Sequence, residues 1–281
     1  MSVSGFARKS IAALFLVSLS ACGTTYVIPE TGDGVSQQAA QMFSAAQAEP
    51  PRKASSLTTA EARFHRVVRR VQPVAEAFCR KEFAEGREID CNVALELDRK
   101  RQDRNAYFTY RQPGNKSPVI RFTLPLLQDV RSDDEVAFVL GHEYGHLIGQ
   151  HIQKQQQQAV AGALILGAIS AYANASAASY GGYYDSNAVS RNVELGAQLG
   201  NAAFSQTYEL ESDMLGTRIA HAAGYDPVKG AQFFARSEDV KGEGGKLSFW
   251  GTHPADSKRV SVVIATMDEI KRKQGLVKKQ K

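Results

Sequence analysis

The sequence predicts an α+β fold that is mostly helical, and two kinds of pattern support this prediction. Apolar residues recur at spacings of three and four in several stretches, which is typical of amphipathic helices. Two shorter runs flank Pro113-Gly114-Asn115, which is typical of a β-hairpin. Hydrophobic residues make up 43% of the 281 residues and charged residues 22%, so the chain can bury a substantial core.

The start of the chain is typical of a bacterial leader. Arg8 and Lys9 form a short basic region, and an apolar stretch of about ten residues follows, too short to span a bilayer. This stretch ends in Leu19-Ser20-Ala21-Cys22, which resembles a lipoprotein cleavage site. The resemblance implies that residues 1–21 are a lipoprotein signal peptide and that Cys22 is lipidated. It places the protein in the bacterial envelope, lipid-anchored at the outer membrane and facing the periplasm.

Charge and cysteine content exclude other classes of protein. The formal charge is +5, and removal of Arg8 and Lys9 with the acid-free leader leaves +3, too little to predict nucleic-acid binding. A mean hydropathy of −0.30 argues against a polytopic membrane protein. Three cysteines are too few for a disulfide-rich scaffold, but Cys79 and Cys91 are close enough in sequence to pair outside the cytosol. The alternative is two buried thiols.

Composition divides the rest of the chain into three parts. Residues 22–56 are rich in Ala, Gln and Ser, contain several prolines and glycines, and have weak periodicity, so they are predicted to be a flexible tether. Residues 57–265 are predicted to be the folded domain. Residues 266–281 contain two lysine-rich clusters and are predicted to be a solvated basic tail.

The first long helix of the domain is expected from Thr58, because Thr58 to Glu61 has the form of a capping box. The apolar residues that follow it at helical spacing are Phe64, Val67, Val68, Val71, Val74 and Phe78. Val93 to Leu97 alternates as a strand does. Asn105 to Tyr110 and Val119 to Thr123 are the two strands of the expected hairpin.

A second helix is expected from Ser132 to Glu135, another capping box, through His146 toward His151. Beyond it, Ala159 to Ala173 is an uncharged run of about 15 residues, short of the roughly 20 that a spanning helix needs. We expect a packed helix there, and the alternative is a helix that dips into the membrane. Ala173 to Ser190 is rich in Gly, Ala, Ser and Tyr and is expected to be a mobile loop.

The second helix carries a pattern of chemical interest. His142-Glu143-Tyr144-Gly145-His146 has the form H-E-x-x-H. On a helix, positions four apart lie on one face, so the two imidazoles can bind one zinc ion. Glu143 is offset from both and is placed to act as a general base toward water at the metal. The alternative is a pair of surface histidines one turn apart.

A third ligand is expected in Tyr208-Glu209-Leu210-Glu211-Ser212-Asp213, which precedes an apolar helical stretch. Glu209 and Asp213 are four apart, so one helix face presents both carboxylates. One of them can bind the metal while the other accepts an N–H from a ligating histidine. Glu211 points elsewhere and is expected to face solvent.

On these motifs the sequence resembles the zinc endopeptidases that include HtpX and the CAAX prenyl proteases, specifically their periplasmic lipoprotein branch, LoiP- and BepA-like without a tetratricopeptide repeat domain. The resemblance covers approximately residues 60–265. Its further markers are Asn105-Ala106, Gly224-Tyr225-Asp226-Pro227, Thr252-His253-Pro254 and Arg259. It implies a zincin-like metalloprotease domain over residues 57–265, with a small hairpin or sheet lining the active-site cleft.

The resemblance also implies roles for single residues. His142, His146 and Glu209 bind one zinc ion per chain, Glu143 is the catalytic base, and Asp213 supports a ligand. His253 is expected at the active site, where it stabilises the oxyanion or caps the zinc when substrate is absent. Arg259 either binds a substrate carboxylate or holds its own loop.

The function that follows from the resemblance is a zinc-dependent endopeptidase in protein quality control. It would cleave unfolded or misassembled envelope proteins by attack of metal-activated water, and one strand of the hairpin would receive the substrate as an added strand. The membrane partner would be reached through the lipid on Cys22. The alternative is a non-proteolytic periplasmic chaperone or assembly factor in which zinc is structural.

Overall fold

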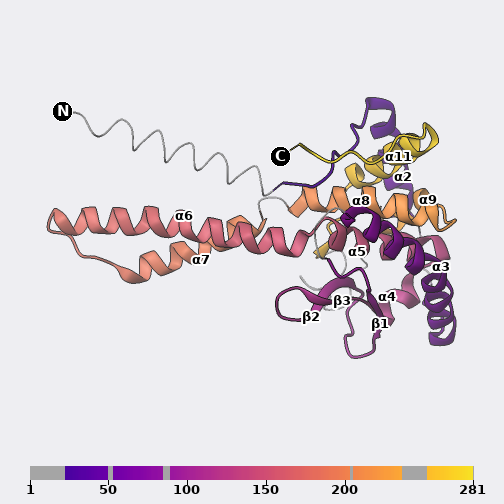
Figure 1. Ribbon diagram of the computed structural model, residues 1–281, viewed down its shortest axis with the longest axis horizontal. Coiled ribbons are helices and arrows are strands. Elements are labelled where there is room, and N and C mark those ends of the chain that lie inside the picture. Colours follow the sequence, from indigo (N-terminus) through magenta and orange to yellow (C-terminus); the bar gives the residue numbers. More distant parts are fainter. Residues whose placement is uncertain (1–22, 50–52, 85–88, 203–204, 236–251, 281) are drawn as a thin grey trace. The chain divides into compact units, whose positions relative to one another are not determined.

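The structure is a computed structural model that describes residues 23–49, 53–84, 89–202, 205–235 and 252–280 (Figure 1). The predicted leader and Cys22 lie outside the described residues. The chain divides into two units. The larger unit comprises Tyr26–Gly149 and Glu209–Val277, and the hairpin unit comprises Gln150–Tyr208 with residues near both ends of the chain.

The larger unit combines helices with one small sheet, which confirms the mostly helical α+β class. Its strands are β1 (Ala94–Asp98), β2 (Ala106–Gln112) and β3 (Lys116–Thr123). Its helices are α2 (Asp33–Gln47), α3 (Leu57–Phe83), α4 (Leu124–Asp129), α5 (Asp133–Ile148), most of α8 (Ser205–Ala222), α9 (Pro227–Ala235) and α11 (Ser257–Lys271).

The sheet has the strand order β1-β3-β2, so β2 lies at an edge. Strand β3 pairs in parallel with β1 and antiparallel with β2, with Phe108 opposite Ile120. The predicted hairpin is therefore confirmed. Its turn contains Gly114 at φ 74° and Asn115 at φ 59°, and these left-handed conformations suit glycine and asparagine.

The caps of two helices test the predicted boundaries. The side chain of Ser132 accepts a hydrogen bond from the backbone N–H of Glu135, as expected at the start of α5. Helix α3 instead begins at Leu57, where Ser56 caps the N–H of Thr59, so the predicted start at Thr58 is off by one residue. Helix α5 ends at Ile148 rather than continuing toward His151, because Gln150 has a left-handed backbone conformation.

The predicted flexible tether is wrong for much of its length. Helix α2 lies within it and packs on α11, where Ala39 forms an apolar cluster with Val260 and Ile264. Tyr26 is buried, and its backbone N–H donates to the carboxylate of Glu211 at 2.6 Å. Val35, Ala39, Met42 and Phe43 of α2 do recur at helical spacing, but the prolines and glycines around this short helix favoured the prediction of a tether.

The predicted basic tail is also corrected. Helix α11 continues to Lys271, so the expected boundary at residue 265 falls inside a helix. After the helix, the carbonyl of Val277 accepts a hydrogen bond from the N–H of Val27 at 2.9 Å. This backbone contact holds the segment after α11 to the segment before α2.

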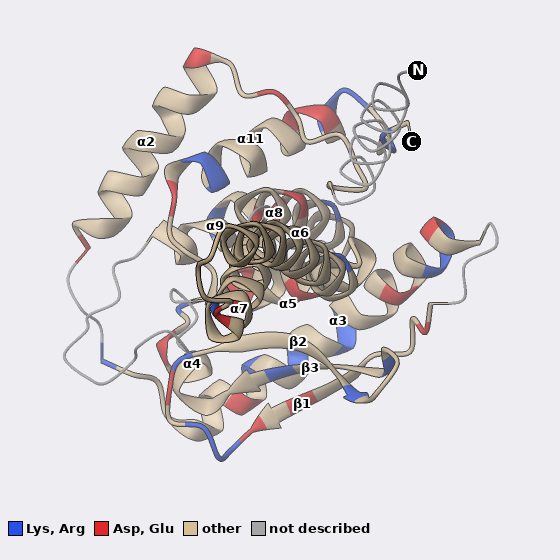
Figure 2. Cartoon of the chain, turned by 90° about the vertical axis from the view of Figure 1, so that its left-hand side faces the viewer, with Lys and Arg blue, Asp and Glu red and all other residues tan. Residues whose placement is uncertain are grey.

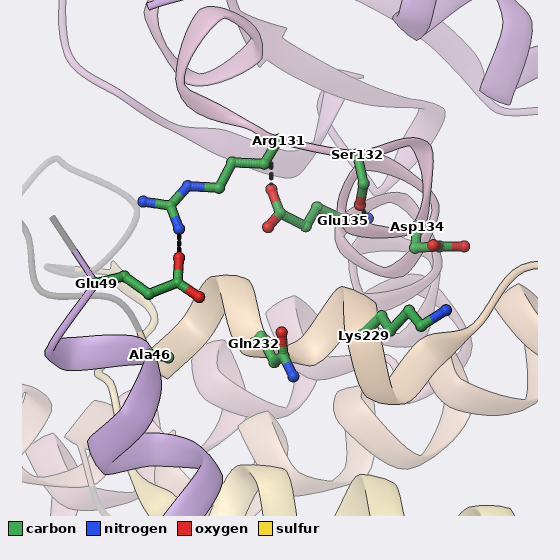
Figure 3. A pocket seen from close by; sticks show the side chains of 8 residues that line it. All are labelled: Ala46, Glu49, Arg131, Ser132, Asp134, Glu135, Lys229 and Gln232. Atoms are coloured by element: carbon green, nitrogen blue, oxygen red, sulfur yellow. Dashed lines mark hydrogen bonds and ion pairs between the residues drawn. The ribbon is translucent and has the colours of Figure 1, made fainter. Parts of the chain in front are cut away.

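A small polar pocket of about 240 Å³ separates the end of α2 from the starts of α5 and α9 (Figure 3). Its lining residues are Ala46, Glu49, Arg131, Ser132, Asp134, Glu135, Lys229 and Gln232. Arg131 forms an ion pair with Glu49, and its backbone N–H donates to Glu135 at 2.6 Å. The ion pair between Glu49 and Arg131 thus joins the segment after α2 to the segment before α5, the helix that carries the H-E-x-x-H motif. No histidine lines the pocket.

The hairpin unit is built from two long helices, α6 (His151–Ser179) and α7 (Ser186–Ala202), which lie side by side (Figure 1). Two expectations fail here. The apolar run is part of a 29-residue helix that packs on α7 along one side and has only four buried residues, so it is not the helix packed in a core that was expected. The segment expected to be a mobile loop, Ala173 to Ser190, is helical apart from a short turn between α6 and α7.

Cys79 at the end of α3 forms a disulfide with Cys91, the pairing expected from the sequence. Replacement of both residues by alanine should lower the free energy of unfolding by about 3 kcal/mol, because the unfolded chain loses the constraint of the closed loop. Denaturant unfolding of the variant and the parent measures this difference. Reduction of the parent with a thiol should reproduce it, and an unchanged midpoint after complete reduction would contradict the prediction.

Candidate active site

Four potential metal ligands from three segments of the larger unit lie within 4.8 Å of one another: His142, His146, Glu209 and His253, here called the metal cluster. The Nε2 atoms of His142 and His146 are 3.1 Å apart. The carboxylate of Glu209 lies 3.4 Å from each of these atoms. The Nδ1 of His253 lies 2.8 Å from Glu209 and 3.3 Å from His142.

Glycines on α5 and α8 allow the two ligand-bearing helices to approach closely. A β-carbon at Gly141 would lie 2.8 Å from the backbone oxygen of Gly216, and one at Gly145 would lie 2.7 Å from the Cα of Ser212. A β-carbon at Gly216 would lie 2.7 Å from the backbone nitrogen of His142. These distances are shorter than side chains tolerate, so the glycines are needed to bring Glu209 within reach of the two histidines.

Asp213 supports His142 from behind the metal cluster. Its Oδ1 lies 2.9 Å from the Nδ1 of His142, which leaves the Nε2 of that histidine directed at the cluster. Such a contact fixes the tautomer and orientation of a ligating imidazole. Asp213 is fully buried, and its own charge is balanced by Arg259, which donates to both carboxylate oxygens at 2.7 and 2.8 Å.

Arg259 is not free to bind substrate, so that expectation is wrong. The guanidinium is 1% exposed and lies 3.8 Å from the ring centre of Phe234. Its Nη1 donates to the carbonyls of His253 and Pro254, at 3.2 and 3.3 Å. Arg259 therefore joins Asp213 to the loop that carries His253, which is the second of the two roles expected from the sequence.

Asp213→Asn should weaken zinc binding by about 10- to 100-fold, because the amide no longer fixes His142 as a carboxylate does. It should also destabilise the fold, since the buried charge of Arg259 loses its partner. Competition with a chromogenic zinc chelator measures the first effect and denaturant unfolding the second. Asp268→Asn, on the exposed face of α11, is the matched control and should change neither. Unaltered zinc affinity in Asp213→Asn would refute the supporting role.

Glu143 lies beside the metal cluster with one carboxylate oxygen held in place. Its Oε2 accepts the backbone N–H of Phe108, on the edge strand β2, at 2.8 Å. Its Oε1 is buried, accepts no hydrogen bond from the described residues, and lies 3.5 Å from the Nε2 of His253. Burial raises the pKa of the Glu143 carboxyl above its usual value. The free oxygen thus faces the cluster with a proton affinity above that of an ordinary carboxylate.

The charges around the metal cluster fit a divalent cation. Burial by itself lowers the pKa of His142, but the hydrogen bonds and charges of Asp213 and Glu209 outweigh it and raise this pKa to about 9. Burial opposes ionisation of Glu209, yet His253 and Arg259 hold its pKa well below the usual value. The two carboxylates thus favour a positive charge beside His142. Imidazole nitrogens with one carboxylate are an ordinary donor set for zinc.

Comparison with known proteins agrees with this geometry. Residues 59–266 match Peptidase family M48. The chain belongs to this family. Members of the M48 family use zinc, and the metal cluster supplies the donors for it.

Two curated relatives carry metallopeptidase names. The metalloprotease LoiP of Escherichia coli (strain K12) is 32% identical over 133 residues, which are 47% of this chain and 49% of LoiP. The mitochondrial metalloendopeptidase OMA1 of Schizosaccharomyces pombe is 26% identical over 166 residues, 56% of this chain and 42% of OMA1. The chain thus spans about half the length of the curated relatives it matches. No solved structure matches the chain significantly.

Two features of the site were not anticipated from the sequence. Glu211, expected to face solvent, is fully buried and accepts the N–H of Tyr26. The hydrogen bond from Phe108 to Glu143 joins the edge strand to the helix with the H-E-x-x-H motif, and nothing in the local sequence indicates it. The hydrophobic neighbours of Glu211 gave the only available signal that it lies inside.

Proposed function

We propose that this M48 protein is a zinc-dependent endopeptidase in which Glu143 is the general base. The observation that carries the proposal is the buried Oε1 of Glu143, which accepts no hydrogen bond from the described residues and lies beside three conventional zinc ligands and a third histidine. A purely structural zinc site needs no such carboxylate, because its four ligands satisfy the metal.

Each residue has a separate task. His142, His146 and Glu209 would hold zinc, which when bound supplies Lewis-acid chemistry and lowers the pKa of water. Glu143 takes a proton from the attacking water at Oε1 and passes it to the leaving amine. The N–H of Phe108 keeps Oε2 occupied, so that proton transfer is confined to one oxygen. Asp213 and Arg259 keep His142 and the His253 loop in position.

Strand β2 is the natural place for substrate. Strand β3 has neighbours on both sides, whereas β2 pairs on one side only among the described strands. Backbone groups alternate along a strand, so Ala106 and Tyr110 present theirs to the same open edge as Phe108. A substrate that adds to this edge must be extended, and unfolded or misassembled envelope proteins meet that requirement. The envelope location rests on the predicted leader and Cys22.

Cleavage of casein by the full chain tests the proposal. The preparation should contain one zinc per chain, lose activity with a zinc chelator, and recover it when zinc is restored. Retention of zinc with no cleavage of casein or of other unfolded proteins would favour the chaperone alternative. Suppression of aggregation by the same preparation then measures that alternative directly.

His253→Ala addresses the fourth member of the metal cluster. Its Nδ1 is close enough to serve as a further zinc donor, in competition with a substrate carbonyl. The variant should therefore bind zinc more weakly in chelator competition, yet cleave casein faster at saturating zinc. His221→Ala, an exposed histidine on α8, should alter neither quantity. A lower rate with undiminished zinc affinity would instead assign His253 to stabilisation of the oxyanion.

A further inference from the structure

The α6–α7 hairpin has an exposed apolar surface that has no part in the candidate active site. No charged residue occurs between Lys154 and Asp185, and this part of α6 is long and apolar enough to cross a membrane. Only 6% of the most apolar 18-residue segment of α6 is buried, whereas a helix in the core of a soluble domain is mostly buried. It also lies far from the N-terminus, so it is not a signal sequence. In Figure 2 the coil of α6 that faces the viewer is tan.

The large exposed apolar residues of α6 lie on the half of the helix that is turned away from α7. Val160, Leu164, Ile169 and Tyr172 are between 60% and 79% exposed, and with 3.6 residues per turn they fall within one half of the helix circumference. At the tip of the hairpin, Tyr180 and Tyr183 are 89% and 87% exposed. Tyrosine is enriched where a protein meets the interface between lipid and water.

The opposite face of α6 is occupied by α7 through small residues. A β-carbon at Gly162 would lie 2.0 Å from the backbone oxygen of Gly196, and one at Gly200 would lie 2.0 Å from that of Gln158. Helices packed through glycines in this way need no apolar side chains between them. The large apolar side chains of α6 are consequently left on its outer face, available to another partner.

The predicted anchor reaches the chain at the base of this hairpin. The described chain begins at Gly23, directly after Cys22, and the hydroxyl of Thr25 accepts a hydrogen bond from Lys154 at 2.8 Å. The carbonyl of Thr25 also accepts the N–H of Lys279 at 2.9 Å. If the leader is cleaved, the lipid on Cys22 holds Thr25 and the start of α6 near the bilayer. If the leader is retained, its apolar stretch does the same.

We propose that the α6–α7 hairpin docks on a lipid bilayer through the exposed apolar face of α6 and the tyrosines of its tip. From Lys154 to Ser179 the helix extends about 38 Å at 1.5 Å per residue. An anchor at its base and tyrosines at its tip meet the same bilayer surface only if the hairpin lies along it. Arg191 and Glu194 on α7 agree with this orientation, because charges are costly in a spanning helix.

Depth-dependent quenching tests the proposal with the full chain. Cys22→Ser leaves a single reactive thiol when combined with Leu164→Cys, which is labelled with an environment-sensitive nitrobenzoxadiazole fluorophore. Vesicles of phosphatidylethanolamine and phosphatidylglycerol carry lipid with a nitroxide on its acyl chain. We expect the nitroxide to quench the label at position 164. A label at Lys229→Cys, exposed on α9, is the matched control and should keep its emission.

In a second experiment, substitutions introduce charge on the apolar face of α6. Val160→Glu with Ile169→Glu should abolish quenching at position 164, while Gln157→Glu, an exposed polar position of the same helix, should leave it intact. Unquenched emission at position 164 in vesicle-bound protein would overturn the proposal. A blue shift that depends on protein concentration but not on nitroxide lipid would also overturn it and assign this face to a second copy of the chain. Zinc content and casein cleavage are separate readouts, so failure here is distinct from failure of the proposed peptidase.

Discussion

Glu143→Gln is expected to reduce casein cleavage by about 100- to 10,000-fold, the usual contribution of a general base. Glutamine has nearly the same shape as glutamate, and its side-chain oxygen can still accept the N–H of Phe108. It cannot take a proton from water at the position of Oε1. The loss should therefore fall on turnover, because neither the zinc ligands nor the edge strand is altered.

Zinc content and denaturant unfolding of Glu143→Gln serve as the controls for this prediction. Both should match the parent protein, so that an inactive variant is also shown to be folded and loaded with metal. If Glu143→Gln retained the parent's rate with one zinc per chain, Glu143 would not be the base. A chaperone with structural zinc would then be the better account, because that function does not require proton transfer.

Gly216→Ala is expected to lower both the stability of the fold and the affinity for zinc. Its methyl group would meet the backbone nitrogen of His142 at 2.7 Å, and neither helix backbone can yield as a flexible side chain can. Overpacking of this kind costs roughly 1 to 3 kcal/mol in unfolding free energy. It should also separate α8 from α5 and so weaken zinc binding by about tenfold or more, as displaced ligand geometry does. Gly141→Ala, on the facing helix, should behave in the same way.

Gly34→Ala is the matched control for the glycine substitutions. Gly34 lies near the start of α2 and has nothing within 4 Å of its added β-carbon. Alanine is the better helix former, so the variant should be as stable as the parent or slightly more stable. Equal stability of Gly216→Ala and Gly34→Ala would show that the close approach of α5 and α8 is not required. Unfolding of the zinc-loaded and zinc-free forms separates lost packing from lost metal.

Local signals in the sequence predicted a large part of the fold. The hairpin was predicted because its turn residues need unusual backbone conformations, which restrict residue choice at those positions. The start of α5 was predicted because the side chain of Ser132 accepts the N–H of Glu135, and the carboxylate of Glu135 accepts the N–H of Arg131 just before the helix. The weakest predictions concerned α2 and the segment after α11. Helix α2 packs on α11, and the segment after α11 pairs with the segment before α2, so both depend on contacts between the two ends of the chain.

The candidate site was predicted unevenly, and the difference follows the range of the interactions. Spacing on one helix was enough to place His142 near His146, and spacing on another to relate Glu209 to Asp213. The role of Arg259 depends on a partner 46 positions earlier in the chain, and only burial excluded it from contact with substrate. Glu211 was misjudged for the same reason, because helical spacing indicates which residues share a face but not what covers that face.

The sequence by itself determined the chemistry of this protein: an H-E-x-x-H helix, a carboxylate pair on a second helix, and the periodicity that makes both helical. These are properties of neighbouring residues, and local geometry enforces them wherever the chain folds. Only the tertiary structure decided that β2 is the edge strand, that Arg259 is buried against Asp213, and that the apolar face of α6 is exposed. Each of these depends on what packs against a segment from a distant part of the chain, and an apolar helix has the same sequence pattern whether protein or lipid covers it.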